Sequence, residues 1–346
     1  MSTNNTNSVG IIANPASGRD IRRLVAHGAV FNNDEKVNIV RRVLLGLEAV
    51  GIERVFFMPD SFSIGPKALD GLQTELDVSI LPMLKTFSQR DSTQAAALMG
   101  AEGVGCIVTL GGDGTNRAVA KECGDVPLMP ISTGTNNVFP TMLEGTIAGM
   151  AAGLVTCGLA DKAVQRAPRL NIFCEQPNES NRGEDSGNVE TPDDIALVDV
   201  AVYDERFVAS RAIWDASKIK ELVLTRVEPG SIGLSSIGAH TPDRVDSPEH
   251  GLYLRLGSDG QPVLAPIAPG LLREVRLVES LPLGPGETVT VKHEQPCVLA
   301  LDGEREIELR QGMTARLQFN PNGPRVIDAR KAIDIAARAG VFVRQN

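Results

Sequence analysis

The sequence contains few aromatic residues, no excess of positive charge and no long apolar run. Of its 346 residues only 4% are aromatic, and the net charge at pH 7 is −9. Proteins that wrap nucleic acid or bind anionic lipid through charge carry basic surfaces, so we expect no nucleic-acid or membrane partner. A transmembrane helix needs roughly 18 or more apolar residues in a row, and none occurs here. The polar N-terminus MSTNNTNS does not resemble a signal peptide.

The five cysteines are scattered along the chain and form no pattern. No C-x-x-C motif occurs, and no cysteine lies with a histidine at the spacing of zinc ligands. An odd number of isolated cysteines argues against a disulfide framework. We therefore expect free thiols, a cytoplasmic protein and small-molecule partners.

The first half of the chain alternates short β-prone runs with helix-like segments. SVGIIANP is followed by the amphipathic DEKVNIVRRVLLGLEAVG, and CIVTL is followed by TNRAVAKECG. This alternation is typical of a mostly parallel sheet covered by helices on both faces, and it predicts an α/β, doubly wound (Rossmann-like) domain over residues 1–158. It also predicts a helix over 91–103 with Asp91 or Ser92 as N-cap, and a long helix over 138–158.

Beyond Gly158 the pattern changes to short alternating runs separated by turn residues. DIALVDVAVYD, GLYLRLG and TVTVKHE are typical of antiparallel strands, and the pattern predicts a β-sandwich domain over 159–325. The acidic segment 176–194 has no periodicity and is predicted to be a loop, either a surface insertion or a flap over a ligand. The tail 326–346 returns to helical spacing and predicts a helix that can pack back on the first domain.

The stretch IVTLGGDGTNRAVA places a glycine-rich turn between a strand and a helix. Glycines let backbone N–H groups approach a phosphate, and a helix N-terminus adds partial positive charge. The turn lacks the lysine of a P-loop and the last glycine of the dinucleotide fingerprint. Its distinguishing residue is Asp113, because a carboxylate beside a phosphate needs a proton, a hydroxyl or a metal ion to bind. The alternative is a turn residue that caps the helix.

The turn Gly111–Thr115 resembles the G-G-D-G-T signature of the superfamily of NAD kinases, diacylglycerol kinases and sphingosine kinases. NPASG at 14–18 is similar to a loop that faces the nucleotide, and STGTNN at 132–137 is similar to a second nucleotide loop. DGE at 302–304 resembles an acidic motif of the lipid-kinase β-domain. Taken alone, NPASG also fits an Asn-Pro turn, and DGE also fits a hairpin turn. Segments such as NPASGRDIRRLV, IGLSSIG and LALDGERE look most like the acetoin catabolism protein X group.

The resemblance implies an ATP-dependent kinase that uses Mg²⁺ and transfers the γ-phosphate to an acceptor hydroxyl in a cleft between two domains. NAD is the default acceptor, with NADP as product. The stretches that hold NAD in NAD kinases are altered here at 196–199 and 228–234, so a lipid kinase and a non-catalytic nucleotide or NAD(H) sensor are the alternatives. The resemblance also suggests a homo-oligomer.

The implied roles fall on residues of these motifs. Asp113 would accept the proton of the acceptor hydroxyl or bind Mg²⁺, Asp302 is the second candidate for catalysis and metal binding, and Glu304 is a catalytic candidate. Arg117 and Arg19 would offset phosphate charge, and each also fits a solvated surface arginine. The residues expected to contact nucleotide or acceptor are Asn14, Ser17, Gly18, Arg19, Gly111, Gly112, Gly114, Thr115, Arg117, Gly134, Thr135, Asn136, Asn137 (which also fits a helix N-cap) and Asp199.

Overall fold

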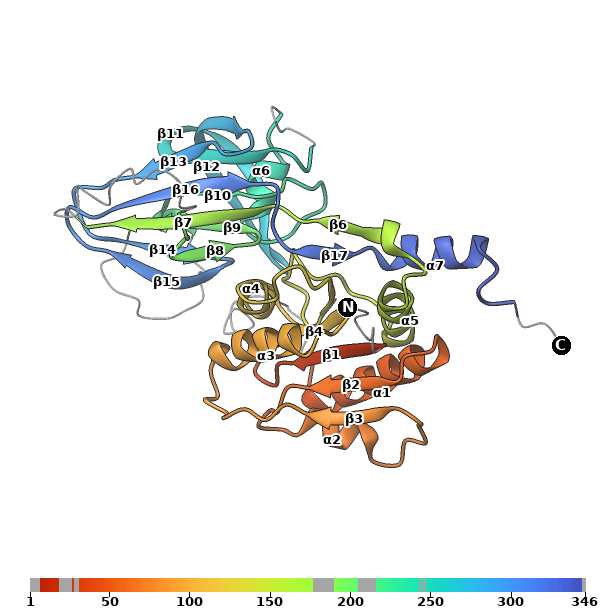
Figure 1. The fold of residues 1–346 in the computed structure, drawn as a ribbon. Coiled ribbons are helices and arrows are strands. Elements are labelled where there is room, and N and C mark those ends of the chain that lie inside the picture. The colour runs from red at the N-terminus through yellow and green to blue at the C-terminus, as the bar shows by residue number, and fades with distance from the viewer. Residues whose placement is uncertain are drawn as a thin grey trace. The chain divides into compact units, whose positions relative to one another are not determined.

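The structure is a computed structural model that describes residues 7–18, 27, 31–176, 190–204, 216–242, 244 and 247–343. The chain divides into two compact units. The first unit comprises residues 1–19, 29–167 and 324–346, and the second comprises residues 20–28 and 168–323. Figure 1 labels the helices and strands of each.

The first unit contains a seven-stranded sheet in the order β3-β2-β1-β4-β5-β17-β6. The first six of these strands are parallel, and β6 is antiparallel to β17. This confirms the predicted doubly wound sheet. The strand order reverses between β1 and β4, because the chain moves outward from β1 to β3 and then returns to the other side of β1. The strands are β1 (Ser8–Ala13), β2 (Arg54–Phe57), β3 (Asp77–Ile80), β4 (Cys106–Gly111), β5 (Leu128–Ser132), β6 (Val164–Arg166) and β17 (Arg325–Ile327).

Helices cover both faces of this sheet (Figure 1). On one face, α1, α2, α5 and α7 share an apolar core with Val9 and Ile11 of β1. On the other face, α3 and α4 pack around Ile12 and Ile107. The central strands are thus buried on both sides, which explains their continuous apolar runs. The helices are α1 (Asn33–Ala49), α2 (Ile64–Leu69), α3 (Gln89–Ala101), α4 (Asp113–Ala120), α5 (Gly145–Thr156), α7 (Ala329–Arg338) and the 3₁₀ turn η2 (Asp161–Ala163).

The second unit contains a six-stranded sheet, β12-β11-β10-β9-β14-β15, and a four-stranded sheet, β13-β16-β7-β8. All paired strands are antiparallel. Side chains of both sheets, among them Val202 and Leu317, form one core, which confirms the β-sandwich. The elements are β7 (Arg169–Glu175), β8 (Asp194–Ala196), β9 (Asp199–Tyr203), η3 (Ala216–Lys218), β10 (Ile219–Leu224), α6 (Ser235–Ala239), β11 (Gly251–Ala268), β12 (Leu271–Leu283), β13 (Thr288–Val291), β14 (Cys297–Leu301), β15 (Glu304–Leu309) and β16 (Thr314–Asn320).

Two predicted helix starts are wrong. Helix α3 begins after Ser88, whose hydroxyl accepts the N–H of Arg90, so neither Asp91 nor Ser92 is the N-cap. Helix α5 begins after Glu144, whose carboxylate accepts the N–H groups of Thr146 and Ile147. Because residues 138–144 are not helical, Asn137 is not the N-cap of this helix.

The first unit continues past residue 158 because β6 pairs with β17 and so extends the parallel sheet. The tail that contributes β17 also carries α7, whose Ala332 and Ala336 are buried in the core of the first unit. The run FVASRAIWD at 207–215, which has the same alternating pattern as the predicted strands, lies outside the described residues. Within the described ranges, no helix has both the length and the apolar character needed to cross a bilayer.

Candidate functional site

Two predicted motifs lie next to each other at the carboxyl ends of β1 and β4. The NPASG loop follows β1 directly, and the GGDGT turn begins at the last residue of β4. The strands pair in parallel, with Ala13 opposite Leu110. In open α/β sheets, ligands bind outside the carboxyl ends of the strands at the point where the strand order reverses, which here lies between β1 and β4.

Asn14 joins the two motifs. Its backbone N–H donates to the carbonyl oxygen of Leu110 at 3.0 Å, and its Nδ2 donates to the hydroxyl of Thr115 at 2.9 Å. Its Oδ1 accepts the N–H of Ala16 at 2.9 Å, which bends the chain into a tight turn. Asn14 therefore fixes the position of the NPASG loop relative to the first turn of α4.

Ser17 and Gly18 connect the same loop to the strand end that carries STGTNN. The hydroxyls of Ser17 and Thr133 share a hydrogen bond of 2.9 Å. Gly18 has a φ of +77°, and a Cβ there would lie 3.0 Å from the carbonyl oxygen of Thr133. Both the left-handed backbone and the close approach require glycine. The three predicted nucleotide loops thus form one connected structure.

Helix α4 begins without a side-chain cap on its backbone N–H groups. The N-cap is Gly112, which has no side chain to accept the first N–H groups of the helix. A Cβ on Gly112 would lie 2.7 Å from Oδ1 of Asn137, and a Cβ on Gly111 would lie 2.5 Å from the side chain of Thr115. The N–H groups of a first helical turn, to which Gly114 belongs, have no acceptor within the helix, and together with the helix dipole they favour an anion at this point.

Asp113 is the first residue of α4, and its carboxylate holds another loop. Its Oδ1 accepts the N–H groups of Val138 at 3.0 Å and of Phe139 at 2.8 Å, and its Oδ2 lies 3.2 Å from the nitrogen of Val138. The residue is 9% exposed. The Asp113 carboxylate therefore anchors the segment that follows STGTNN to the GGDGT turn.

The STGTNN loop contains a buried amide that finds no partner among the described residues. Ser132 Oγ donates to the carbonyl oxygen of Gly134 at 2.8 Å, and Asn137 Nδ2 donates to Ser132 Oγ at 2.8 Å, which fold the loop back on itself. Both Nδ2 and Oδ1 of Asn136 are buried without a hydrogen bond. Thr135 lies in the same loop and is half-buried. Because an unsatisfied buried amide is costly, a ligand with a donor and an acceptor fits here.

Of the two arginines predicted to offset phosphate charge, the structure describes only Arg117. Arg117 on α4 is only 1% exposed, so the alternative of a solvated surface arginine is wrong for this residue. Arg19 lies outside the described residues. A contact of either guanidinium with phosphate stays a prediction. The neighbouring Asn116 stabilises the turn, because its amide accepts from Thr109 Oγ1 at 2.6 Å and donates to the carbonyl oxygen of Gly112 at 2.9 Å.

In the second unit, Asp302 and Gly303 form the two-residue turn of the β14–β15 hairpin. Their φ angles are +52° and +78°, as a type I′ turn requires. The Asp302 carboxylate is buried and accepts the N–H groups of Leu197 at 3.0 Å, Val198 at 2.8 Å and Asp199 at 3.3 Å. The Asp302 N–H donates to the carbonyl oxygen of Asp199 at 2.9 Å. Asp302 thus fixes the backbone that carries Asp199.

Glu304, the first residue of β15, lies opposite Leu301 of β14. The three acidic residues predicted for the acceptor side, Asp199, Asp302 and Glu304, are therefore close together in the second unit. Within the described part of the chain, no group of three or more acidic, histidine or cysteine side chains is arranged to hold a metal ion. Mg²⁺ is commonly held by one or two carboxylates together with substrate phosphates, so Asp113 or Asp302 would bind it only alongside a nucleotide. Their metal roles stay predictions.

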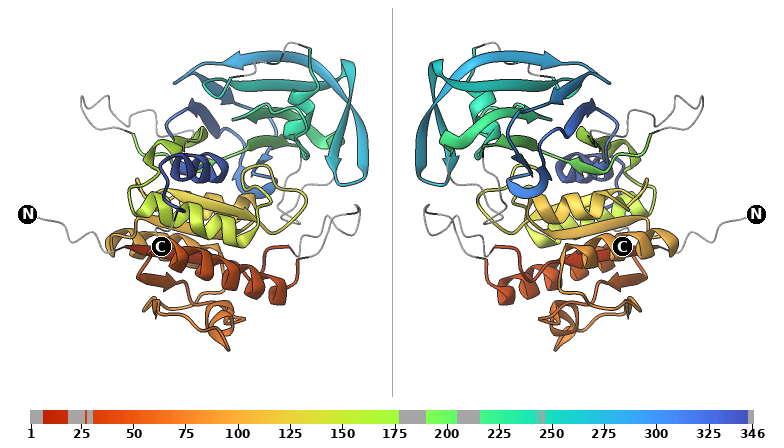
Figure 2. Two further views of the ribbon diagram at one scale, coloured as in Figure 1. Left: turned by 90° about the vertical axis from the view of Figure 1, so that its right-hand side faces the viewer. Right: turned by 90° about the vertical axis from the view of Figure 1, so that its left-hand side faces the viewer.

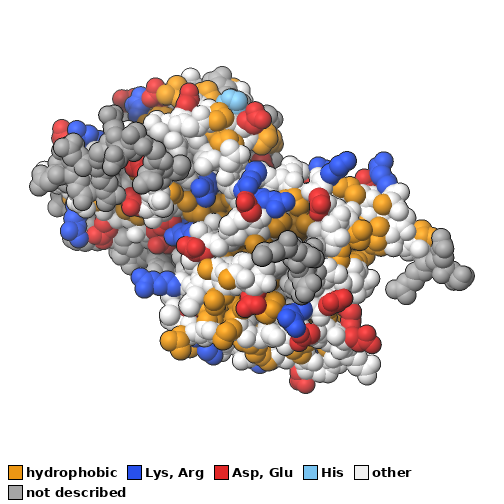
Figure 3. Space-filling view, viewed as in Figure 1, with side chains coloured by type: hydrophobic (Ala, Val, Ile, Leu, Met, Phe, Trp, Pro, Cys, Tyr) orange, Lys and Arg blue, Asp and Glu red, His pale blue; other side chains and the backbone are white. Residues whose placement is uncertain are grey.

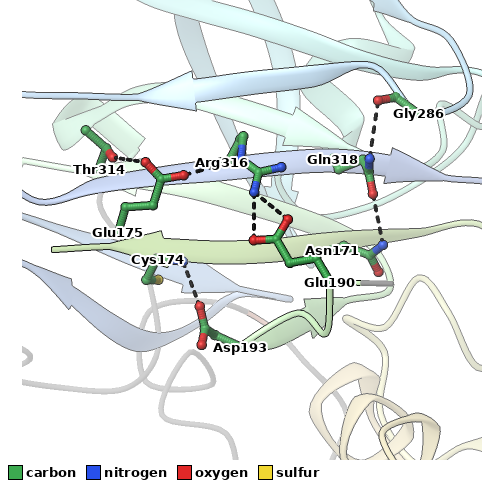
Figure 4. A network of polar contacts seen from close by, with 9 residues as sticks. All are labelled: Asn171, Cys174, Glu175, Glu190, Asp193, Gly286, Thr314, Arg316 and Gln318. Carbon is green, nitrogen blue, oxygen red and sulfur yellow. Dashed lines mark hydrogen bonds and ion pairs between the residues drawn. The ribbon is translucent and has the colours of Figure 1, made fainter. Parts of the chain in front are cut away.

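The two ends of the predicted acidic loop are tied to one strand (Figure 4). Arg316 of β16 forms ion pairs with Glu175 at 3.5 Å and with Glu190 at 2.7 Å, and its guanidinium lies over the ring of Phe173. The hydrogen bond with Glu190 is the main cause that raises the pKa of Arg316. Residues 177–189 lie outside the described residues, so whether this segment covers a ligand stays a prediction. On the face drawn in Figure 3, acidic and basic side chains are interspersed.

Each half of the chain matches a known protein family. The ATP-NAD kinase N-terminal domain matches residues 9–158, and the acetoin catabolism protein X C-terminal domain matches residues 185–322. Acetoin catabolism protein X of Cupriavidus necator is 36% identical over 347 aligned positions, which cover 95% of this chain and 92% of that protein. This chain belongs to the acetoin catabolism protein X family. The first unit of this family member accordingly carries a domain of the NAD kinase type.

The sequence analysis of this family member missed Lys36, which supports the NPASG loop. Lys36 is fully buried in the first turn of α1. Its ammonium donates to the carbonyl oxygens of Asn14 at 2.8 Å and Ser17 at 2.7 Å, and to Oδ1 of Asn33 at 3.1 Å. Lys36 precedes Val40 by four residues and so lies on the apolar stripe of the helix. A lysine on an apolar stripe is the signal that could have identified it.

Proposed function

We propose that this protein is an ATP-dependent kinase that transfers the γ-phosphate of ATP to the 2′-hydroxyl of NAD. The observation that carries the proposal is the joining of NPASG and GGDGT by Asn14 where the strand order reverses. Phosphoryl transfer depends mainly on positioning and charge stabilisation, and a rigid backbone cradle at a helix N-terminus supplies both. The NAD kinase-type domain supports the same assignment.

We assign each residue of the cradle a role that its contacts support. The N–H groups of Gly112, Gly114 and Thr115 hold the phosphates of ATP, and Asn136 binds the ribose or base through its buried amide. Asp113 positions the loop at 138–139 and accepts the proton of the acceptor hydroxyl. Mg²⁺, when bound with the nucleotide, neutralises charge that develops on the phosphates.

In the second unit, Asp302 keeps the backbone of 197–199, and with it Asp199, in place. Asp302 is in this proposal a positioning residue, because its carboxylate already accepts three backbone N–H groups.

A non-catalytic nucleotide or NAD(H) sensor is the second candidate. The observation that favours it is the Asp113 carboxylate, which accepts two backbone N–H groups and so has a structural use without catalysis. A sensor would keep the cradle and bind ATP or NAD, yet transfer no phosphate.

The deciding experiment measures transfer of labelled γ-phosphate from ATP with Mg²⁺ to NAD, NADH, diacylglycerol or sphingosine. Asp113→Asn is compared with wild type and with the control Asp125→Asn, whose side chain is 77% exposed. Because Asp113→Asn also weakens the anchor at 138–139, ATP binding is measured in parallel. Labelled NADP from wild type and Asp125→Asn, but not from an Asp113→Asn variant that still binds ATP, supports the kinase. ATP binding with no transfer by wild type supports the sensor, and label on a lipid supports a lipid kinase.

A further inference from the structure

The distal half of the β11–β12 hairpin is a two-stranded ribbon. Only residues 252–255 of β11 pair with β10, whereas the ladder between β11 and β12 continues to Ala268 and Leu271. The inner face of the ribbon packs on the core of the second unit through Ala265 and Val275. Both strands run along the margin of the second unit (Figure 2).

The two edges of this ribbon differ. On the β11 side, Pro262 and Pro266 have no N–H to offer, and proline is a common device that protects a sheet edge. Two carbonyl oxygens on that side are also occupied, because Pro266 accepts the N–H of Gly233 at 3.1 Å and Leu264 accepts from His240 Nδ1 at 2.8 Å. The β11 edge is therefore closed.

Over residues 271–281 the β12 edge has neither prolines nor carbonyl oxygens that accept from another segment among the described residues. No proline occurs from residue 271 to 281, and in the part of the chain that the structure describes no backbone hydrogen bond joins β12 to a segment other than β11. On its outer face, Leu272 is 56% exposed, and Glu274 and Arg276 follow at alternate positions; Val278, where the register with β11 shifts, is 37% exposed. A long open edge with exposed apolar side chains is a template for strand addition.

The other end of the same sheet shows what a protected edge looks like here. Strand β15 carries acidic residues at alternate positions 304, 306 and 308. The register with β14 shifts between Leu299 and Ala300, so these side chains do not share one face, but three like charges along one strand still disfavour pairing with an identical strand. The contrast singles out β12 as the edge available for pairing.

We propose that β12 pairs edge to edge with β12 of a second copy of this chain, antiparallel and about a two-fold axis at Val275. In this register Leu272 lies opposite Val278 of the second copy, and Glu274 lies opposite Arg276 of the second copy. The symmetry repeats each pair, which gives two apolar pairs and two ion pairs on one face.

The charges specify this register. Within one chain, Glu274 and Arg276 are already 3.8 Å apart, so pairing at Val275 produces four charges of alternating sign. An axis at Glu274 or at Arg276 would instead place that residue opposite itself, and like charges directly opposite are unfavourable. On the inner face, Val275 meets Val275 of the second copy and extends the apolar core.

The test is the dissociation constant of the full-length dimer, from sedimentation velocity over a wide concentration range. Glu274→Arg and Arg276→Glu each place like charges opposite one another twice and are expected to raise this constant at least about tenfold. The double variant Glu274→Arg/Arg276→Glu restores the alternation and is expected to restore the dimer, which also shows that the fold survives. Glu308→Arg on the opposite edge is the control and leaves the constant unchanged.

A wild-type chain that stays monomeric at every concentration overturns the proposal. So does a dimer that tolerates both single charge reversals, or one that the double variant fails to restore, because each result places the interface elsewhere.

Discussion

Replacing Lys36 by methionine removes a buried ammonium that donates to three oxygens, of which the carbonyl oxygen of Asn14 keeps a second donor in Ser17 Oγ at 2.8 Å. The oxygens are the carbonyls of Asn14 and Ser17 and the amide oxygen of Asn33, at 2.7 to 3.1 Å from Nζ. A hydrogen bond to a charged group contributes about 1.5–3 kcal/mol, but these three share one donor and are not additive. Water can reach the half-buried NPASG loop and recover part of the loss. We expect the free energy of unfolding to fall by about 2–4 kcal/mol.

Urea unfolding at fixed pH measures this change, and calorimetric titration with ATP measures its effect on the loop. The control is Lys331→Met on α7, an exposed lysine whose loss changes stability by less than about 0.5 kcal/mol. Because Lys36 holds the NPASG loop, which we propose faces the phosphates, Lys36→Met is also expected to weaken ATP binding, whereas Lys331→Met is not. Equal stability of the two variants would refute the reasoning.

Three further predictions concern residues of both units. Gly111→Ala places a Cβ 2.5 Å from Thr115 and is expected to cost about 1–3 kcal/mol in thermal unfolding, whereas Gly100→Ala in α3, where a Cβ has open space, should be neutral or stabilising. Asp302→Asn weakens three backbone hydrogen bonds and is expected to lower the free energy of unfolding by about 1–3 kcal/mol. The control Asp259→Asn changes an exposed residue and should leave the free energy of unfolding almost unchanged, and a smaller loss at Asp302 would contradict its anchoring role. Burial raises the thiol pKa of Cys174 and Cys297 from 9.0 to about 11, so iodoacetamide should label both slowly at neutral pH and faster as pH rises toward 11. Because these thiols ionise near pH 9 in the unfolded chain and near pH 11 in the folded one, the free energy of unfolding falls as the pH rises from about 9 to about 11. Rapid labelling at pH 7 would contradict the raised pKa values.

The sequence predicted the fold class well because the signals were local and repeated. Alternating strand and helix patterns indicated the doubly wound sheet, and period-two runs indicated the sandwich. Helix starts were harder to predict, because several polar residues near each start can act as the cap. Ser88 and Glu144 fill that role, and only the tertiary structure distinguishes them from Asp91 and Asn137.

The motifs of the candidate site were visible, but the bonds among them were not. NPASG, GGDGT and STGTNN are each readable as turns after strands. That Asn14 reaches Thr115, and that Asp113 holds Val138, depends on which strands are neighbours, and no local pattern gives strand order. Lys36 went unnoticed because its function is tertiary, and the open β12 edge because edge status depends on the whole sheet.

We propose that the carboxyl ends of β1 and β4 hold the phosphates of a nucleotide. A crystal structure of the protein with Mg²⁺ and a non-hydrolysable ATP analogue tests it most directly. We expect phosphate density at the N-terminus of α4, hydrogen-bonded to the backbone of Gly112–Thr115 and flanked by the NPASG loop, with the amide of Asn136 on the nucleoside. Nucleotide density at any other place, with this cradle unchanged, would contradict it.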